Sequence, residues 1–175
     1  MWWVAGGQAV DAFLGYKSRE HGDLDIAVLR RDQLIVQRHL AEWELYAAVG
    51  GGRLQRWQPG QELPSSVHDL WCRRDDSAPW SMQLMLDNAE MDQWLFRRDS
   101  RVQKALATLT GRIGGIPYLA IEVQLLYKAR EHDLAKNDAD FRACVPRLNA
   151  DQKRWLIGAL EVVHPGHVWT AALDS

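Results

Sequence analysis

Residues 2–29, WWVAGGQAVDAFLGYKSREHGDLDIAVL, decide the fold. The stretch opens with apolar residues followed by two glycines, which predicts a short buried strand over 2–5 and a turn at Gly6 and Gly7. Apolar side chains at helical spacing then predict a helix over 8–14. The order of these elements is therefore strand, glycine turn and helix.

Two aspartates stand at the mouth of a second predicted strand, which covers 24–29. Alternate residues of a strand face the same side, so Asp23 and Asp25 are expected to point into one space. Two carboxylates held that close repel each other unless a cation lies between them. Mg²⁺ prefers carboxylate oxygens and commonly shares its shell with phosphates, so the pair favours a magnesium site. A solvated loop is the competing interpretation of such a short motif.

The glycine turn adds a second feature to this short stretch. Gly6 and Gly7 allow backbone N–H groups to approach a phosphate, and the following helix contributes the favourable partial charge of its N-terminus. The turn matches neither a Walker loop nor the dinucleotide-binding glycine pattern. A purely structural turn is the alternative, but the turn and the aspartates together favour an anion site beside a cation site.

The middle of the chain carries short apolar segments separated by Gly, Pro, Asp and Ser. After a predicted helix over 31–40, these segments indicate a mixed or antiparallel sheet. The predicted strands are 44–49, 53–57, 68–74, 81–86 and 93–98.

After about residue 100 the apolar spacing becomes helical. We expect an α/β domain over residues 1–100 and a helical region over 101–175 that packs on it. The predicted helices are 116–134, with Pro117 in its first turn, 138–148 and 150–165.

The composition is that of a globular protein of 175 residues, with 47% hydrophobic and 25% charged residues. Lys and Arg number 21 against 23 Asp and Glu, a balance that gives no support for nucleic acid or a membrane surface as a partner. Cys72 and Cys144 lie too far apart in sequence to suggest a zinc motif or a disulfide framework. With no apparent targeting or membrane-spanning segment, we expect a cytoplasmic protein.

The motif GGQAVDAFLG (6–15) followed by REHGDLDIAV (19–28) resembles the nucleotidyltransferase superfamily. The similarity is to the branch of small aminoglycoside and lincosamide nucleotidyltransferases, and it is strongest over 3–30. WSMQLMLD (80–87), WLFRRD (94–99) and YLAIEVQLLYKAR (118–130) are less specific matches. The resemblance implies an α/β (α+β) fold, with a mixed β-sheet, flanking helices and a C-terminal helical region.

The resemblance also implies an enzyme that moves a nucleoside monophosphate, with AMP as the expected one, from a nucleoside triphosphate to a hydroxyl of a small molecule such as an aminoglycoside-like antibiotic. Asp23 and Asp25 would hold Mg²⁺. Relatives add a third carboxylate as metal ligand or general base, and Asp87 at the end of the predicted strand is the closest match. Asp69 is its competitor.

Residues that contact the triphosphate can be carried over in the same way. Arg19 and His21 flank the aspartates, and Lys128 matches a family lysine, although a helix lysine is often merely solvated. Asp69 and Glu122 are expected to line the acceptor pocket, with a helix cap as the alternative for Glu122. The implied nucleotide-binding residues are Gly6, Gly7, Gln8, Arg19 and Lys128.

Two other functions use the same fold. One is a nucleotide-binding or antitoxin-like regulatory protein without turnover, and the other is a protein AMP-transferase. The expected partners are a nucleoside triphosphate, a small hydroxylated acceptor and, as a further option, a second copy of the chain in a homodimer.

Overall fold

The computed structural model describes residues 1–174, and its first elements follow the predicted order. β1 (Trp2–Val4) leads directly into α1 (Gly6–Leu14), which ends at Gly15 in the left-handed conformation. β2 (Leu24–Leu29) then returns antiparallel to β1. The helix begins at Gly6 rather than Gln8, so both glycines belong to its first turn.

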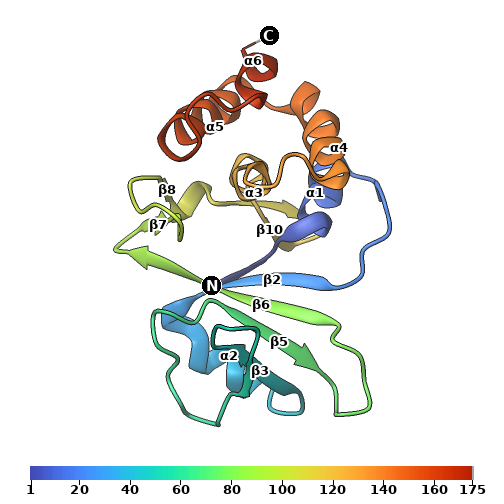
Figure 1. Ribbon diagram of the computed structural model, residues 1–175, viewed down its shortest axis with the longest axis vertical. Helices are drawn as coiled ribbons and strands as arrows, with labels where there is room; N and C mark the ends of the chain where they lie inside the picture. The colour runs from blue at the N-terminus through green and yellow to red at the C-terminus, as the bar shows by residue number, and fades with distance from the viewer. Residues whose placement is uncertain (175) are drawn as a thin grey trace.

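The remaining strands build a ten-stranded mixed sheet around β2. Figure 1 shows β2 beside β6 within this sheet. They are β3 (Glu44–Ala48), β4 (Leu54–Arg56), β5 (Asp69–Arg73), β6 (Met82–Glu90), β7 (Gln93–Leu95), β8 (Gln103–Ala105), β9 (Thr110–Ile113) and β10 (Ile116–Leu119). The main order is β4-β3-β5-β6-β2-β1-β10-β9, and β7 and β8 extend from the far end of β6. β2–β6 and β1–β10 are parallel pairs, which confirms the predicted mixed sheet.

The helices divide between the two faces of this sheet (Figure 1). α2 (Gln33–His39) packs beside β3 and β5, whereas α1 lies with the C-terminal helices on the other side. The C-terminal helices are α3 (Ile121–Ala129), α4 (Ala135–Cys144), α5 (Ala150–Val163) and α6 (Trp169–Leu173). No helix within residues 1–174 is long and apolar enough to cross a membrane.

β6 shows how the alternation of side chains places the polar residues. Met82, Leu84 and Leu86 join the buried cluster on the α2 side. Met85 packs against the other cluster, under α1 and α3, and Gln83 and Asp87 share its face of the strand. The register pairs Asp25 with Gln83, so the predicted metal ligand also faces the C-terminal helices.

The predicted helix over 116–134 is wrong in its first part. Residues 116–119 form β10, which pairs with β9 and runs parallel to β1, and the helix begins only at Ile121. Pro117 therefore lies in a strand opposite Arg112 and not in a first helical turn. Pairing with β1, which is distant in sequence, overrides the local helical spacing.

Candidate active site

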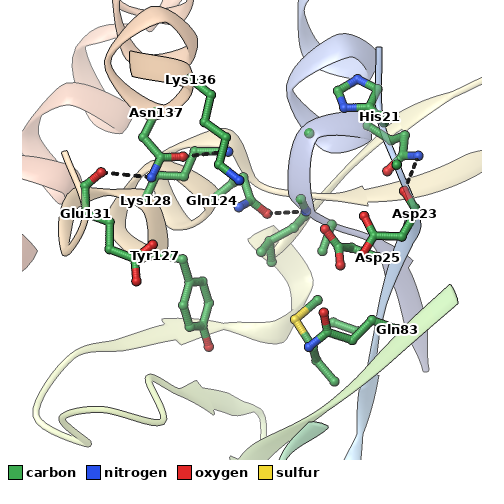
Figure 2. A pocket seen from close by; sticks show the side chains of 18 of the residues that line it. His21, Asp23, Asp25, Gln83, Gln124, Tyr127, Lys128, Glu131, Lys136 and Asn137 are labelled. Atoms are coloured by element: carbon green, nitrogen blue, oxygen red, sulfur yellow. Dashed lines mark hydrogen bonds between the residues drawn. The ribbon is translucent and has the colours of Figure 1, made fainter. Parts of the chain in front are cut away.

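A cavity of about 560 Å³ lies between the N-terminus of α1, the β2–β6 face, α3 and α4. Figure 2 shows Asp23 and Asp25 on one side and Lys128, Lys136 and Asn137 facing them from the helices. We call this cavity the cleft. It brings together most of the site residues predicted from the sequence, namely Gly6, Gly7, Gln8, Arg19, Asp23, Asp25, Asp87 and Lys128.

Asp25 carries a strongly perturbed carboxyl at the mouth of β2. Burial, together with the neighbouring charge of Asp23, raises its pKa to about 6, and the ammonium groups of Lys128 and Lys136 only partly oppose this. Burial and a like charge both disfavour the ionised form of a carboxyl, so the direction of the shift follows from its surroundings. A bound cation would reverse it.

Gly6 provides the room that Asp25 needs. A Cβ built on Gly6 would lie 1.8 Å from Oδ2 of Asp25, and the φ of +63° is itself unfavourable for other residues. Its N–H donates to Oε1 of Gln124 at 2.8 Å, the bond drawn in Figure 2. This amide therefore contacts α3 in the structure, and the absence of a side chain at Gly6 leaves space for the Asp25 carboxylate.

Gly7 and Gln8 occupy the first turn of α1, where backbone N–H groups have no intrahelical partner. A Cβ on Gly7 would meet the His21 ring at 2.3 Å, so this glycine lets the ring lie against the helix. Gln8 donates through Nε2 to the carbonyl of Asp23 at 2.8 Å. These contacts fix the helix N-terminus beside the two aspartates.

The loop between α1 and β2 is held by Asp11. Its carboxylate accepts hydrogen bonds from the N–H and Oγ of Ser18, at 3.0 and 2.5 Å. The other oxygen lies 2.6 Å from Nε2 of His21. The loop therefore presents Arg19 and His21 to the cleft in a fixed arrangement, which the sequence did not predict.

Lys128 belongs to a buried network under α4. Its ammonium lies 2.7 Å from Oδ2 of Asp140 and 3.3 Å from Oδ1 of Asn137. Arg19 approaches the same Asp140 oxygen at 3.5 Å. Asp140 is only 3% exposed, so one buried carboxylate holds both predicted phosphate-binding cations at the wall of the cleft.

Asp87 lies inside β6 and not at a strand end, because β6 exchanges its partner β2 for β7 after this residue. Oδ2 accepts from Nε1 of Trp94 at 2.9 Å, and Oδ1 from the hydroxyl of Tyr127 at 3.4 Å. Burial raises its pKa to about 6, against the effect of the Trp94 bond. Asp87 is four residues beyond Gln83, roughly 13 Å along the strand, so it is not brought together with Asp25 around one ion.

Asp69 lies on β5 opposite Met85, on the face that carries Asp25. Its Oδ1 accepts from Arg97 at 3.0 Å and from Gln83 at 3.2 Å. The Asp69 charge contributes to the raised pKa of Asp25, so the two carboxylates interact through space. Asp69 is therefore close enough to influence the site, although it is not among the residues that line the cleft.

Glu122 lies away from the cleft. It is 4% exposed, pairs with Lys104 at 2.8 Å and accepts from Gln152 of α5 at 3.2 Å. Glu122 lies in the first turn of α3, where its negative charge also stabilises the helix through the helix dipole. The structure thus places Glu122 in helix packing and outside the lining of the cleft.

The metal-binding capacity of the cleft rests on a pair of residues. Within residues 1–174, no group of three His, Cys, Asp or Glu side chains could hold a metal ion. Mg²⁺ is commonly held by one or two carboxylates, with phosphates and water completing its shell. The crowded carboxylates of Asp23 and Asp25 fit that requirement, provided that a nucleotide supplies the remaining oxygens.

Other cleft residues were not predicted from the sequence. Gln83, Gln124 and Tyr127 face the cleft from β6 and α3 (Figure 2), and Arg97 and Arg98 follow β7. The two arginines had a visible signal, since a charged pair directly follows an apolar segment. The glutamines had none, because their position depends on the pairing of β6 with β2 and on the packing of α3.

The sequence and the fold both match known proteins. The family model for aminoglycoside-2''-adenylyltransferase matches residues 1–138, whereas no curated protein matches the chain. The crystal structure of ANT(2'')-Ia in complex with adenylyl-2''-tobramycin superposes with a TM-score of 0.55 and 16% identity, over 93% of this chain and 88% of that chain. The solution structure of ANT(2'')-Ia superposes with a TM-score of 0.55 and 17% identity, over 99% of this chain and 85% of that chain.

A second antibiotic-modifying enzyme has the same fold. The lincomycin-bound lincosamide adenylyltransferase LnuA superposes with a TM-score of 0.52 and 17% identity, over 82% of this chain and 84% of that chain. At these low sequence identities the superpositions establish only that the fold is shared. The family model, in contrast, matches most of the chain by sequence. The chain therefore belongs to the aminoglycoside-2''-adenylyltransferase family and is an enzyme of the nucleotidyltransferase type.

Proposed function

We propose that the protein transfers AMP from ATP to a hydroxyl of a small antibiotic-like molecule and that the reaction requires Mg²⁺. The observation that carries the proposal is the position of Asp23 and Asp25 beside the N-terminus of α1. This arrangement offers a cation site and an anion site next to each other. A nucleoside triphosphate with its metal needs both.

Asp23 and Asp25 would hold the Mg²⁺. When bound, the ion would neutralise the phosphate oxygens and the leaving pyrophosphate. The amides of Gly7 and Gln8 donate toward the phosphates from the first turn of α1. Arg19, beside the first turn of α1, and Lys128, on the facing wall, are both held by Asp140 and supply positive charge.

Asp87 is the proposed base, because a carboxyl with a pKa near 6 holds a proton weakly enough to exchange it at neutral pH. It would accept the proton of the acceptor hydroxyl as the oxygen attacks the α-phosphorus and pyrophosphate leaves. Asp69 is the alternative, since its charge contributes to the raised pKa of Asp25 and that of Asp87 is not among the causes of this shift. The two residues lie on neighbouring strands of the same face.

The test is pyrophosphate release by the purified protein with Mg²⁺, each of four nucleoside triphosphates and a panel of hydroxylated antibiotics. We expect release with ATP that depends on both metal and acceptor, together with an acceptor whose mass increases by one AMP. Asp25→Asn serves as the control for contaminating enzymes. Nucleotide binding without release across the panel would favour the regulatory alternative, and label transfer to a protein would favour the protein AMP-transferase.

A further inference from the structure

Three histidines meet where α5 ends and α6 begins. His164 follows the last turn of α5, His167 precedes α6, and His132 lies between α3 and α4. The ring centre of His167 lies 4.6 Å from that of His132 and 5.9 Å from that of His164. We call these three residues the histidine cluster. None of them lines the cleft.

The hydrogen bonds of His167 require a neutral ring. Its Nε2 lies 3.0 Å from the carbonyl oxygen of Ala129, at the end of α3, so this nitrogen carries the proton and donates. Its Nδ1 accepts from the backbone N–H of Trp169, in the first turn of α6, at 3.1 Å. A second proton on the ring would set two donors, Nδ1–H and the N–H of Trp169, against each other. His167 is only 8% exposed, so water is poorly placed to separate them.

The surroundings of the cluster also oppose a second proton. Burial lowers the pKa of both His164 and His167 below the ordinary histidine value of 6.5. At His164 the like charges of Arg98, His132 and Arg130 lower the pKa further. At His167 the charges of His132 and His164 have the same effect. The cluster thus disfavours its own protonation in the folded state.

Compensating interactions around the cluster are few. Nε2 of His164 is buried and has no hydrogen-bond partner within residues 1–174. The bond to the Ala129 carbonyl is the one influence that raises the pKa of His167. Glu131, in the same loop as His132, acts on Arg98 and is not among the charges that shift the pKa of either buried histidine. A proton taken up by the cluster therefore finds no carboxylate to balance it.

A stacked pair of aromatic rings connects α6 with α4. The rings of Trp169 and Phe141 are nearly parallel, with an angle of 4° and a distance of 4.0 Å between their centres. Each of the two residues is 3% exposed. Phe141 directly follows Asp140, whose carboxylate holds Lys128 and Arg19 at the cleft. Release of α6 would therefore remove the packing that keeps Asp140 in place.

We propose that the histidine cluster holds α6 against α3 at neutral pH and releases it in acid, and that this release weakens nucleotide binding in the cleft. The effect on the nucleotide rests on the proposed function, whereas the release of α6 does not. The folded state binds the protons of His164 and His167 less tightly than the unfolded state. The contact is therefore complete above about pH 6.5 and is lost as the pH falls below this value.

Hydrogen exchange of the full protein, followed by mass spectrometry, measures the release of α6 without any nucleotide. After correction for the intrinsic pH dependence of exchange, protection of α6 should fall on the order of tenfold between pH 7.5 and pH 5.5. His164→Gln removes a like charge and no hydrogen bond of Nε2, so protection should be lost about 0.5 pH unit lower. His39→Gln, which removes an exposed histidine of α2, is the control and should behave like wild type.

Two results of this experiment would overturn the release of α6. One is protection in wild type that does not change between the two pH values. The other is a loss of protection that His164→Gln leaves at the same pH as in wild type and His39→Gln.

Calorimetry with Mg²⁺ and a non-hydrolysable ATP analogue tests the effect on the cleft. Titration of Asp25 weakens binding in every variant alike, so the comparison is made between proteins at one pH. At pH 5.5 His164→Gln should bind the analogue roughly threefold more tightly than wild type, and at pH 8 the two should bind equally. Equal affinities at pH 5.5 would overturn the link between α6 and the cleft. Failure of wild type to bind the analogue at pH 8 would instead reject the proposed function, and the exchange result would stand.

Discussion

Gly6 lies so close to Asp25 that a Cβ would stand 1.8 Å from its carboxylate oxygen. The first glycine of the chain and the second aspartate of the D-x-D motif are therefore one structural unit. The glycine is required by the aspartate, and the aspartate can enter the cleft only beside a residue without a side chain.

Gly6→Ala should consequently lose Mg²⁺-dependent nucleotide binding and destabilise the protein. A positive φ alone costs an alanine about 1–2 kcal/mol, and the clash with Asp25 adds to it. Gly114→Ala is the matched control, because Gly114 also has a positive φ (+55°) but open space around its Cβ position. Chemical denaturation and calorimetry of both variants check this. Equal losses of stability in the two would contradict the claimed contact.

The raised pKa of Asp25 predicts how metal-free stability depends on pH. A pKa of about 6 in the folded protein, against the ordinary aspartate value of 3.8, means that the folded state holds the proton more tightly than the unfolded state. Asp25 therefore reduces stability as pH rises from about 4 to 6. In metal-free buffer at pH 8, Asp25→Asn should be more stable than wild type by on the order of 1–3 kcal/mol.

The same difference should shrink as the pH falls through this range and approach zero below about pH 3, where the carboxyl is protonated in both states. Denaturation curves of wild type and Asp25→Asn at several pH values measure it, and the comparison cancels the titration of Asp87, which both proteins share. A variant that is less stable than wild type at pH 8 would show that the carboxylate is not strained by its surroundings.

The buried pair of Lys128 and Asp140 should show strong energetic coupling. Asp140→Asn leaves a buried ammonium without its carboxylate, which costs about 3–5 kcal/mol. Lys128→Met added to Asp140→Asn should recover part of that loss, with a coupling of roughly 1–3 kcal/mol. The exposed pair of Arg154 and Asp151 is the control and should couple by about 0.5 kcal/mol or less. A double-mutant cycle in denaturant measures both.

Asp87→Asn and Asp69→Asn should separate the two candidates for the base. We expect Asp87→Asn to retain Mg²⁺-dependent nucleotide binding and to lose about 10²–10⁴-fold in turnover. It should also lose the rise of kcat through pH 6 that its pKa implies. Asp69→Asn should lose less than about tenfold. The reverse ranking, measured by pyrophosphate release, would assign the base to Asp69.

The sequence predicted the beginning of the fold well because its signals there are local. Gly15 ends α1 as predicted, and alternation along β2 places Asp23 and Asp25 at the cleft. Asp87 also lines the cleft, but the prediction that β6 stops before it was wrong. The continuation of β6 depends on its pairing with β7, which no local pattern reveals.

The second wall of the cleft could not be predicted for a related reason. Gln124 reaches Gly6, and Asp140 reaches Lys128 and Arg19, through contacts that bring distant segments together. Glu122 and Lys128 lie on the same helix, and only its packing decides that Lys128 faces the cleft whereas Glu122 faces α5. Helical spacing alone did not distinguish the two residues, and both were predicted to belong to the site.

The most direct test of the account is calorimetric titration of a non-hydrolysable ATP analogue into the protein with and without Mg²⁺, repeated for Asp23→Asn and Asp25→Asn. Wild type should bind the analogue at least tenfold more tightly with Mg²⁺ (~1.4 kcal/mol). Either substitution should remove this dependence, since each takes one carboxylate from the pair. An affinity that is indifferent to Mg²⁺ in wild type, or a dependence that survives both substitutions, would contradict it.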